Sequence, residues 1–282
     1  MNMRKLLAFF FACATTVVVM AQNINFTNAE VKSLCVANWD TDKDGQLSRQ
    51  EAAAVISLGT VFRENSNIGE FPELKYFTGI TAIDDSAFYK SSISGEVRIP
   101  GNVKTIGDYA FNSCRNMTRV VLEEGVQTVG WHSFSGPIRT MVLPTTLTYM
   151  SSMAVDPYVN SDPSSGIFVP DGDLYLYSRS KTPAAINGFA FYFMFSQAHL
   201  IVPPGYIDDY KAVEGWSHFG EYLQFGDVNM DGNVNGRDVV ALRNSVMGRK
   251  PSPFNEYCAD VNIDNSVNGR DVIALRNLIL GN

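Results

Sequence analysis

Three segments of twelve residues carry oxygen-bearing side chains at alternating positions: DTDKDGQLSRQE at 40–51, DVNMDGNVNGRD at 227–238 and DVNIDNSVNGRD at 260–271. The last two are nearly identical and begin 33 residues apart. In such a loop the side chains at positions 1, 3 and 5 point inward, position 7 offers its backbone carbonyl, and an acid at position 12 closes the shell. A hard cation requires six to eight oxygens at short range, so this spacing predicts calcium sites.

The first segment meets every position of an EF-hand calcium loop, with Gly45 at the sharp turn and Glu51 as the closing ligand. An apolar stripe over residues 31–35 predicts an entering helix, and the leaving helix begins at Glu51. EF-hands usually pair, and the sequence offers no evident partner hand, so we expect a metal-clamped cap on the repeats that follow. An acidic surface turn is the alternative. The predicted ligands are Asp40, Asp42, Asp44, Gln46 and Glu51.

Each of the two tail segments runs into an apolar helical stretch, VVALRNSVM or VIALRNLIL, that ends at Gly248 or Gly281. Asn265 replaces the turn glycine of the second loop, which is tolerable because Asn adopts left-handed backbone angles more readily than other residues. A segment this short holds little apolar core, so bound calcium should contribute much of its stability. The predicted ligands are Asp227, Asn229, Asp231, Asn233 and Asp238, and Asp260, Asn262, Asp264, Ser266 and Asp271.

Two such loop–helix units, each lacking an entering helix and closing with Asp, resemble a type I dockerin module over residues 226–282. The resemblance implies calcium-dependent docking to a cohesin domain, which attaches the bearer to a multiprotein and often polysaccharide-degrading complex. The family's partner-contacting positions fall here on Gly236, Arg237, Arg243 and Asn244, and on Gly269, Arg270, Arg276 and Asn277. The family often carries Ser or Thr where Gly-Arg stands, a departure that leaves the partner's identity open.

The two copies agree at all eight of these positions, whereas the intervening loop residues differ. A duplicated surface of this kind predicts that one partner is engaged in either of two orientations, related by a half turn. Preservation of internal packing is the alternative explanation for the duplication.

The elements ahead of the tail form a repeat. Apolar residues recur with a period of about 23 in two series that stay in phase: Ile80, Val103, Val126 and Leu147, and Phe88, Phe111, Phe134 and Val155. One unit of strand and returning turn cannot bury its own apolar face, and stacked units make a continuous core. The pattern therefore predicts a solenoid, with the phenylalanines in the interior of the coils.

The text IPGNVKTIGDYAFNSCRNMTRVVL at 99–122 and its neighbours resemble the BspA-type leucine-rich repeats of bacterial surface proteins, over roughly residues 77–225. Tyr210, Trp216 and Phe219 lie at helix-compatible spacing in the segment that ends such arrays, and we expect them to cover the last coil. Residues 156–180 depart from the repeat, and their text DPYVNSDPSSG at 156–166 predicts a surface loop.

The first 21 residues resemble a secretory signal peptide. Arg4 and Lys5 precede an apolar run from Leu6 to Met20 that is too short to span a bilayer comfortably, and small residues precede Gln22. A lipoprotein leader cleaved before Cys13 is the alternative. The sequence thus favours a secreted, extracellular protein, either free or held at the cell surface, and no later stretch predicts a transmembrane segment.

Cleavage leaves Cys35, Cys114 and Cys258, an odd and widely spaced set that favours buried free thiols over disulfides or a zinc site. The formal charge of −7 disfavours nucleic acid as a partner.

These observations predict an α+β multidomain protein. We expect a β-rich leucine-rich-repeat solenoid of about 23-residue period, an N-terminal EF-hand-like helical cap, and a small all-α C-terminal dockerin. The expected boundaries are a signal peptide at 1–21, a calcium-binding cap at 22–58, the repeat domain with its closing segment at 59–225, and the dockerin at 226–282. Two calcium ions are expected in the dockerin and one in the N-terminal loop.

The expected function is that of a secreted, non-catalytic binding protein. Its repeats would recognise an unidentified protein or glycan, and its dockerin would tether it to a cohesin-like domain of a scaffold. The alternatives are a surface adhesin whose tail is only a calcium-stabilised terminal module, and a carbohydrate-active enzyme subunit. Catalysis has little support, because His132, His199 and His218 are scattered and no nucleophile accompanies them.

Overall fold

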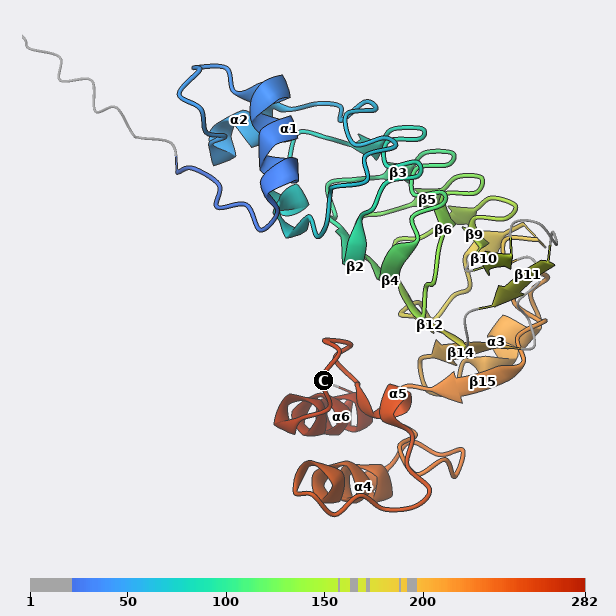
Figure 1. Cartoon of the computed structure of the whole chain (residues 1–282). Helices are drawn as coiled ribbons and strands as arrows, with labels where there is room; N and C mark the ends of the chain where they lie inside the picture. Colours follow the sequence, from blue (N-terminus) through green and yellow to red (C-terminus); the bar gives the residue numbers. More distant parts are fainter. Residues whose placement is uncertain are drawn as a thin grey trace, which may run out of the picture.

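The computed structural model describes residues 22–156, 158–162, 167–170, 173–187, 189–191 and 197–281, so the expected leader at 1–21 lies outside the described residues. The chain forms an arched β-solenoid with a helical segment at one end and a small helical module at the other (Figure 1). The predicted fold class is therefore confirmed. Within the described ranges, no helix is both long enough and apolar enough to cross a membrane.

The N-terminal segment consists of α1 (Ala29–Trp39), α2 (Arg49–Ala54) and the 3-10 helix η1 (Pro72–Tyr76). Ser48 and Glu51 form a capping box at the start of α2. The ring of Trp39 packs against Phe62 and Phe77 of the first coil, with centroids at 6.1 and 5.4 Å. This segment therefore covers the apolar end of the solenoid that would otherwise be open.

Two parallel sheets form the walls of the solenoid. The five-stranded sheet runs in the order β1 (Ala82–Ile83), β3 (Thr105–Ile106), β5 (Thr128–Val129), β8 (Tyr149–Met150) and β13 (Ala185–Ile186). The six-stranded sheet runs β15 (Glu221–Gln224), β14 (Ala198–Val202), β12 (Leu174–Ser178), β7 (Thr140–Leu143), β4 (Asn116–Leu122) and β2 (Ser94–Ile99). Consecutive short strands pair one coil apart because each coil repeats the same path.

The predicted aromatic interior is confirmed. Phe88, Phe111 and Phe134 are fully buried, and their rings stack with centroids 4.7 and 5.2 Å apart and within 8° of parallel. Phe62 extends the stack at 5.0 Å from Phe88. One ring per coil at one register position fills the space that each returning turn encloses.

The prediction of a surface loop at 156–166 is wrong for its described part. β6 (Phe134–Ser135) pairs in parallel with β9 (Val155–Asp156). Directly after β9, β10 (Tyr158–Asp162) and β11 (Ile167–Pro170) form an antiparallel hairpin. β12 then returns to the six-stranded sheet between β7 and β14. The interruption thus inserts a hairpin and leaves the stacking of the main sheet continuous.

The closing segment behaves as expected. Around α3 (Ile207–Lys211), Tyr210 and Trp216 are fully buried and Phe219 is 6% exposed. The indole Nε1 of Trp216 donates to the carbonyl of Ala184 at 2.8 Å, which ties the segment to the preceding coil.

The C-terminal module follows β15 without a linker. It contains α4 (Gly236–Val246), the short α5 (Glu256–Ala259) and α6 (Gly269–Leu280), with a small core in which Leu242 and Leu275 are fully buried. At the junction, Gly226 has φ +84°, and an added Cβ would lie 2.4 Å from Leu275 Cδ1. Glycine adopts this positive φ without the strain that a side chain would bring. The three described cysteines are free and buried, as predicted.

Candidate calcium loops and partner surface

In each predicted calcium loop, the aspartate at position 1 organises the turn. The Asp227 carboxylate accepts from the backbone N–H groups of Asp231 and Gly232 at 3.1 and 3.0 Å. Asp260 accepts from those of Asp264 and Asn265 at 3.0 and 2.9 Å. The two tail loops therefore share one backbone conformation, although one turns at glycine and the other at asparagine.

In both tail loops the aspartate at position 12 is fully buried and closes the loop onto its helix. Asp238 accepts from Val228 N at 2.9 Å through one oxygen and from Asn235 N at 2.9 Å through the other. Asp271 accepts in the same way from Asn268 N at 2.9 Å and from Asn262 N at 3.2 Å.

Asn235 and Asn268 complete capping boxes at the starts of α4 and α6. These two N-caps were not among the residues predicted from the sequence. The Asn-x-x-Asp spacing ahead of each apolar run is the signal that would have found them.

The described carboxylates gather in two places. Oxygens of Asp260, Asp264 and Asp271 lie within 4.8 Å of one another, and so do those of Asp40, Asp42 and Asp44. Burial raises the pKa of Asp260 and of Asp227, and the neighbouring carboxylates of Asp271 and Asp238 raise them further. A set of oxygen donors with this much negative charge fits a hard divalent cation such as calcium.

The remaining predicted ligands of the tail lie in the same loops. The side chains of Asn229 and Asn262, at position 3, accept from the backbone N–H groups of Asp231 and Asp264 at 2.9 and 2.8 Å. At position 7, the carbonyls of Asn233 and Ser266 accept from the side-chain amides of Asn235 and Asn268. A bound ion would share each carbonyl with its amide donor or take the place of that donor.

The N-terminal loop differs at its closing position. Glu51 Oε1 accepts from the N–H and hydroxyl of Thr41 at 2.7 and 2.9 Å, and Oε2 accepts from those of Ser48, both at 2.9 Å. Glu51 thus holds the two ends of the loop together while it caps α2. The side chain of Gln46 accepts from Lys32 at 2.7 Å, and the donor that position 7 offers to an ion is its backbone carbonyl.

Residues 22–24 pair with the end of this loop. Ile24 N donates to Leu47 O, and Arg49 N donates to Gln22 O, both at 2.9 Å, around a bridge between Asn23 and Ser48. The leading segment therefore satisfies the backbone groups along that edge of the loop.

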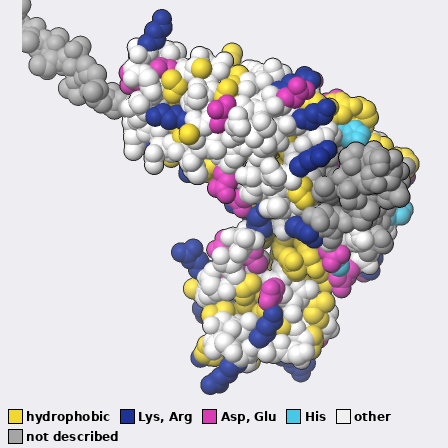
Figure 2. Space-filling view, viewed as in Figure 1, with side chains coloured by type: hydrophobic (Ala, Val, Ile, Leu, Met, Phe, Trp, Pro, Cys, Tyr) yellow, Lys and Arg dark blue, Asp and Glu magenta, His cyan; other side chains and the backbone are white. Residues whose placement is uncertain are grey.

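The eight predicted partner-contacting residues lie along the outer faces of α4 and α6, and all are exposed except the half-buried Asn244. Figure 2 shows Lys and Arg side chains along the outer edge of this module. The structure adds two apolar residues that were not predicted from the sequence. Val240 and Ile273 hold the same position in the two copies and are 58% and 61% exposed.

On each helix the exposed apolar residue lies three residues from an arginine on either side, so the three side chains share one face. Arg237, Val240 and Arg243 form the first partner stripe, and Arg270, Ile273 and Arg276 form the second. Nothing in the sequence marks Val240 and Ile273 as exposed, so their exposure in the structure is what identifies them.

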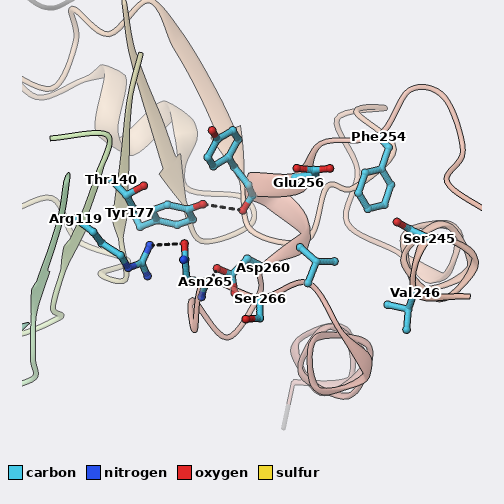
Figure 3. A pocket seen from close by; sticks show the side chains of 12 residues that line it. Arg119, Thr140, Tyr177, Ser245, Val246, Phe254, Glu256, Asp260, Asn265 and Ser266 are labelled. Carbon is cyan, nitrogen blue, oxygen red and sulfur yellow. Dashed lines mark hydrogen bonds between the residues drawn. The ribbon is translucent and has the colours of Figure 1, made fainter. Parts of the chain in front are cut away.

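The module also contacts the solenoid. A pocket of about 410 Å³ lies between them, lined by solenoid residues such as Arg119 and Tyr177 and by module residues such as Tyr257 and Asn265 (Figure 3). Hydrophobic side chains gather where the two parts meet (Figure 2). The described structure therefore holds the tail module against the repeats.

Comparison with known families identifies both parts of the chain. Residues 61–157 match the BspA type leucine rich repeat region in six copies, and residues 225–280 match the dockerin type I domain. The repeat match ends where the β10–β11 hairpin begins. The N-terminal loop precedes both matches. A search of curated proteins found no match.

Proposed function

We propose that this dockerin-bearing repeat protein is a secreted, non-catalytic binding protein whose C-terminal module fastens it to a cohesin-bearing scaffold. Type I dockerins bind cohesin domains, and both matched modules are binding modules. The observation that carries the proposal is the duplicated partner stripe, presented twice by helices whose loops share the same hydrogen bonds. The complex would be cellulosome-like and polysaccharide-degrading, and the repeats would recognise a protein or glycan.

Calcium is the proposed cofactor, with one ion in each tail loop and one in the N-terminal loop. The ligands would be the side chains at positions 1, 3, 5 and 12 and the carbonyl at position 7. Bound calcium would neutralise the clustered carboxylates and hold each helix start in place. The ion thus would order the first turn of α4 and α6, from which Arg237 and Arg270 project.

The two stripes support binding in two orientations. Each offers two guanidinium groups around one aliphatic side chain, which suits a partner surface with acidic groups around an apolar centre. Since the two stripes carry the same chemistry, loss of one would leave the other able to bind.

The test is capture of an immobilised type I cohesin domain by the purified chain, in calcium and in excess chelator. We expect capture in calcium only. Two matched variants, Arg237→Ala/Val240→Ala and Arg270→Ala/Ile273→Ala, should each retain capture, and the fourfold variant should lose it. Capture that resists chelator would overturn the calcium-dependent tether, and loss of capture in one double variant alone would overturn the two-orientation proposal.

A second candidate is a surface adhesin in which the tail is only a calcium-stabilised terminal module. The packing of the module against the outer face of the six-stranded sheet favours it, because a module that only stabilises the array needs no contact beyond this one. Absence of capture across a set of type I cohesins, with calcium binding retained, is the outcome that this candidate predicts.

A further inference from the structure

The outer face of the six-stranded sheet carries an apolar row. Val121, Val142, Tyr177, Ile201 and Leu223 occupy consecutive strands in direct register. Their neighbours along each strand, such as Val120 and Leu200, belong to the interior core, so the row points away from it. All five row residues are nevertheless buried, because the tail module covers them with Cys258 and Ile263.

Ile263 occupies position 4 of the second calcium loop and has φ +59°. This left-handed conformation is unfavourable for a β-branched residue. At the same position of the first loop, Met230 has φ +62°, but its unbranched side chain is 38% exposed. Ile263 is 6% exposed, and its burial against the sheet offsets the strain. The two loops therefore differ at position 4 in a way that suits contact with the sheet.

Arg119 of β4 holds the same loop through polar contacts. Its guanidinium donates to the carbonyl of Ile263 at 3.0 Å and to the side-chain oxygen of Asn265 at 3.4 Å (Figure 3). Its side chain is only 9% exposed, and Glu96 pairs with it at 3.0 Å. These contacts join residues more than 140 positions apart in the sequence.

The contact with Arg119 gives a physical reason for asparagine at position 6 of this loop. A glycine there offers no side chain, and a Cβ added to Gly232 of the first loop would meet nothing within 4 Å. Asn265 keeps the left-handed turn, with φ +70°, and adds an oxygen that accepts from Arg119. A second polar contact joins the hydroxyl of Tyr177 to the carbonyl of Tyr257 at 3.1 Å.

We propose that the second calcium loop is an intramolecular clamp that docks the tail module on the apolar row of the repeat sheet. Calcium in this loop would fix the turn that presents Ile263 and Asn265, and loss of calcium from it would release the module. The clamp rests on the calcium-binding part of the proposed function. Its consequence is that one ion controls both the direction of the partner stripes and the exposure of an apolar surface on the repeats.

Cys258 is the reporter for the test. It is fully buried, and it belongs to the cluster formed with the sheet rather than to the core of the module. Undocking would therefore expose its thiol while the module stays folded. Cys114, fully buried inside the solenoid, is the internal reference. The measurement is the rate of iodoacetamide labelling of each cysteine in the purified chain, read by mass spectrometry in saturating calcium.

Ile263→Ser should raise Cys258 labelling at least about tenfold relative to Cys114, because it removes the apolar contact and no proposed ligand. Asn265→Gly should raise Cys258 labelling less. This variant carries the same turn residue as the first loop and loses only the contact to Arg119. The matched control is Gly232→Asn in the first loop, which should leave Cys258 protected.

Calcium titration calorimetry and helical circular dichroism on the same variants separate the two proposals. Calcium binding and helicity like those of the unmodified chain, with labelling raised, support the clamp. Calcium binding without any rise in Cys258 labelling in Ile263→Ser overturns the clamp alone. Absence of calcium binding by the unmodified chain overturns the clamp together with the calcium-dependent tether.

Discussion

At the scale of single residues, the closing aspartates of the tail combine two roles. Asp271 is fully buried, accepts from backbone N–H groups at both ends of its loop, and is a proposed calcium ligand. Asn268 caps the same helix by accepting from Arg270 N at 2.8 Å but is not a proposed ligand. Comparing the two residues separates helix capping from metal binding.

We predict that Asp271→Ala and Asn268→Ala each destabilise the calcium-free module by about 1 kcal/mol, the usual cost of a lost cap. In calcium, Asp271→Ala should destabilise the module more than Asn268→Ala does, because only Asp271→Ala also loses a calcium ligand. Urea unfolding followed by helical circular dichroism, with and without calcium, checks this. Equal losses for both variants in calcium would remove Asp271 from the ligand set.

Glu51 is the corresponding residue of the N-terminal loop. Partial burial raises the pKa of its carboxyl, but hydrogen bonds from Ser48 and Thr41 outweigh burial and lower the pKa from its ordinary value of 4.5 to about 2. A folded-state pKa below the unfolded value means that the carboxylate stabilises the fold fully above about pH 4.5 and loses this effect as pH falls toward 2.

We therefore predict that acid lowers the melting temperature of the unmodified chain more steeply than that of Glu51→Gln between pH 5 and about 2. Thermal melts across that range in chelator check the difference, since chelator removes any contribution from calcium. Parallel profiles for the two proteins would show that the Glu51 hydrogen bonds do not stabilise the cap.

At the scale of elements, the aromatic stack connects the coils. Phe111 has a ring on either side, at 4.7 and 5.2 Å, and no exposed surface. Phe111→Ala should cost about 3–5 kcal/mol through lost burial and the remaining cavity. Tyr149→Ala is the control, because Tyr149 lies in the same array but is 43% exposed, and its loss should cost far less. Urea unfolding, followed by the circular dichroism signal of the strands, measures the free energy of unfolding of both variants. Similar losses of this free energy in the two variants would contradict an interior stack.

Periodicity predicted these elements well because each coil makes local contacts with its neighbours. A 23-residue period in Phe88, Phe111 and Phe134 directly reports a position in the stack. The β10–β11 pair interrupts the period, so the repeat pattern gave no information about it. Loop spacing placed the proposed calcium ligands for the same local reason, whereas the exposed apolar residues Val240 and Ile273 became evident only once their exposure was known.

At the scale of the whole molecule, the contact between tail and solenoid could not be predicted from the sequence. Arg119 and Ile263 are 144 residues apart, and no spacing rule links them. Their meeting depends on the arch of the solenoid and on the short junction at Gly226, both of which are properties of the assembled chain (Figure 1). The N-terminal loop is therefore tied to one end of the solenoid through Trp39, and the second tail loop is tied to the outer face of the six-stranded sheet through Ile263.

We propose that these oxygen-rich loops bind calcium and thereby shape the surface that a partner recognises. Titration calorimetry of the purified chain with calcium tests it most directly, with Asp238→Ala/Asp271→Ala as the matched variant. We expect heat of binding for the unmodified chain with one ion per loop, and in the variant a loss of the part of that heat due to the tail loops. An unmodified chain that releases no heat, with an unchanged circular dichroism spectrum, would contradict it.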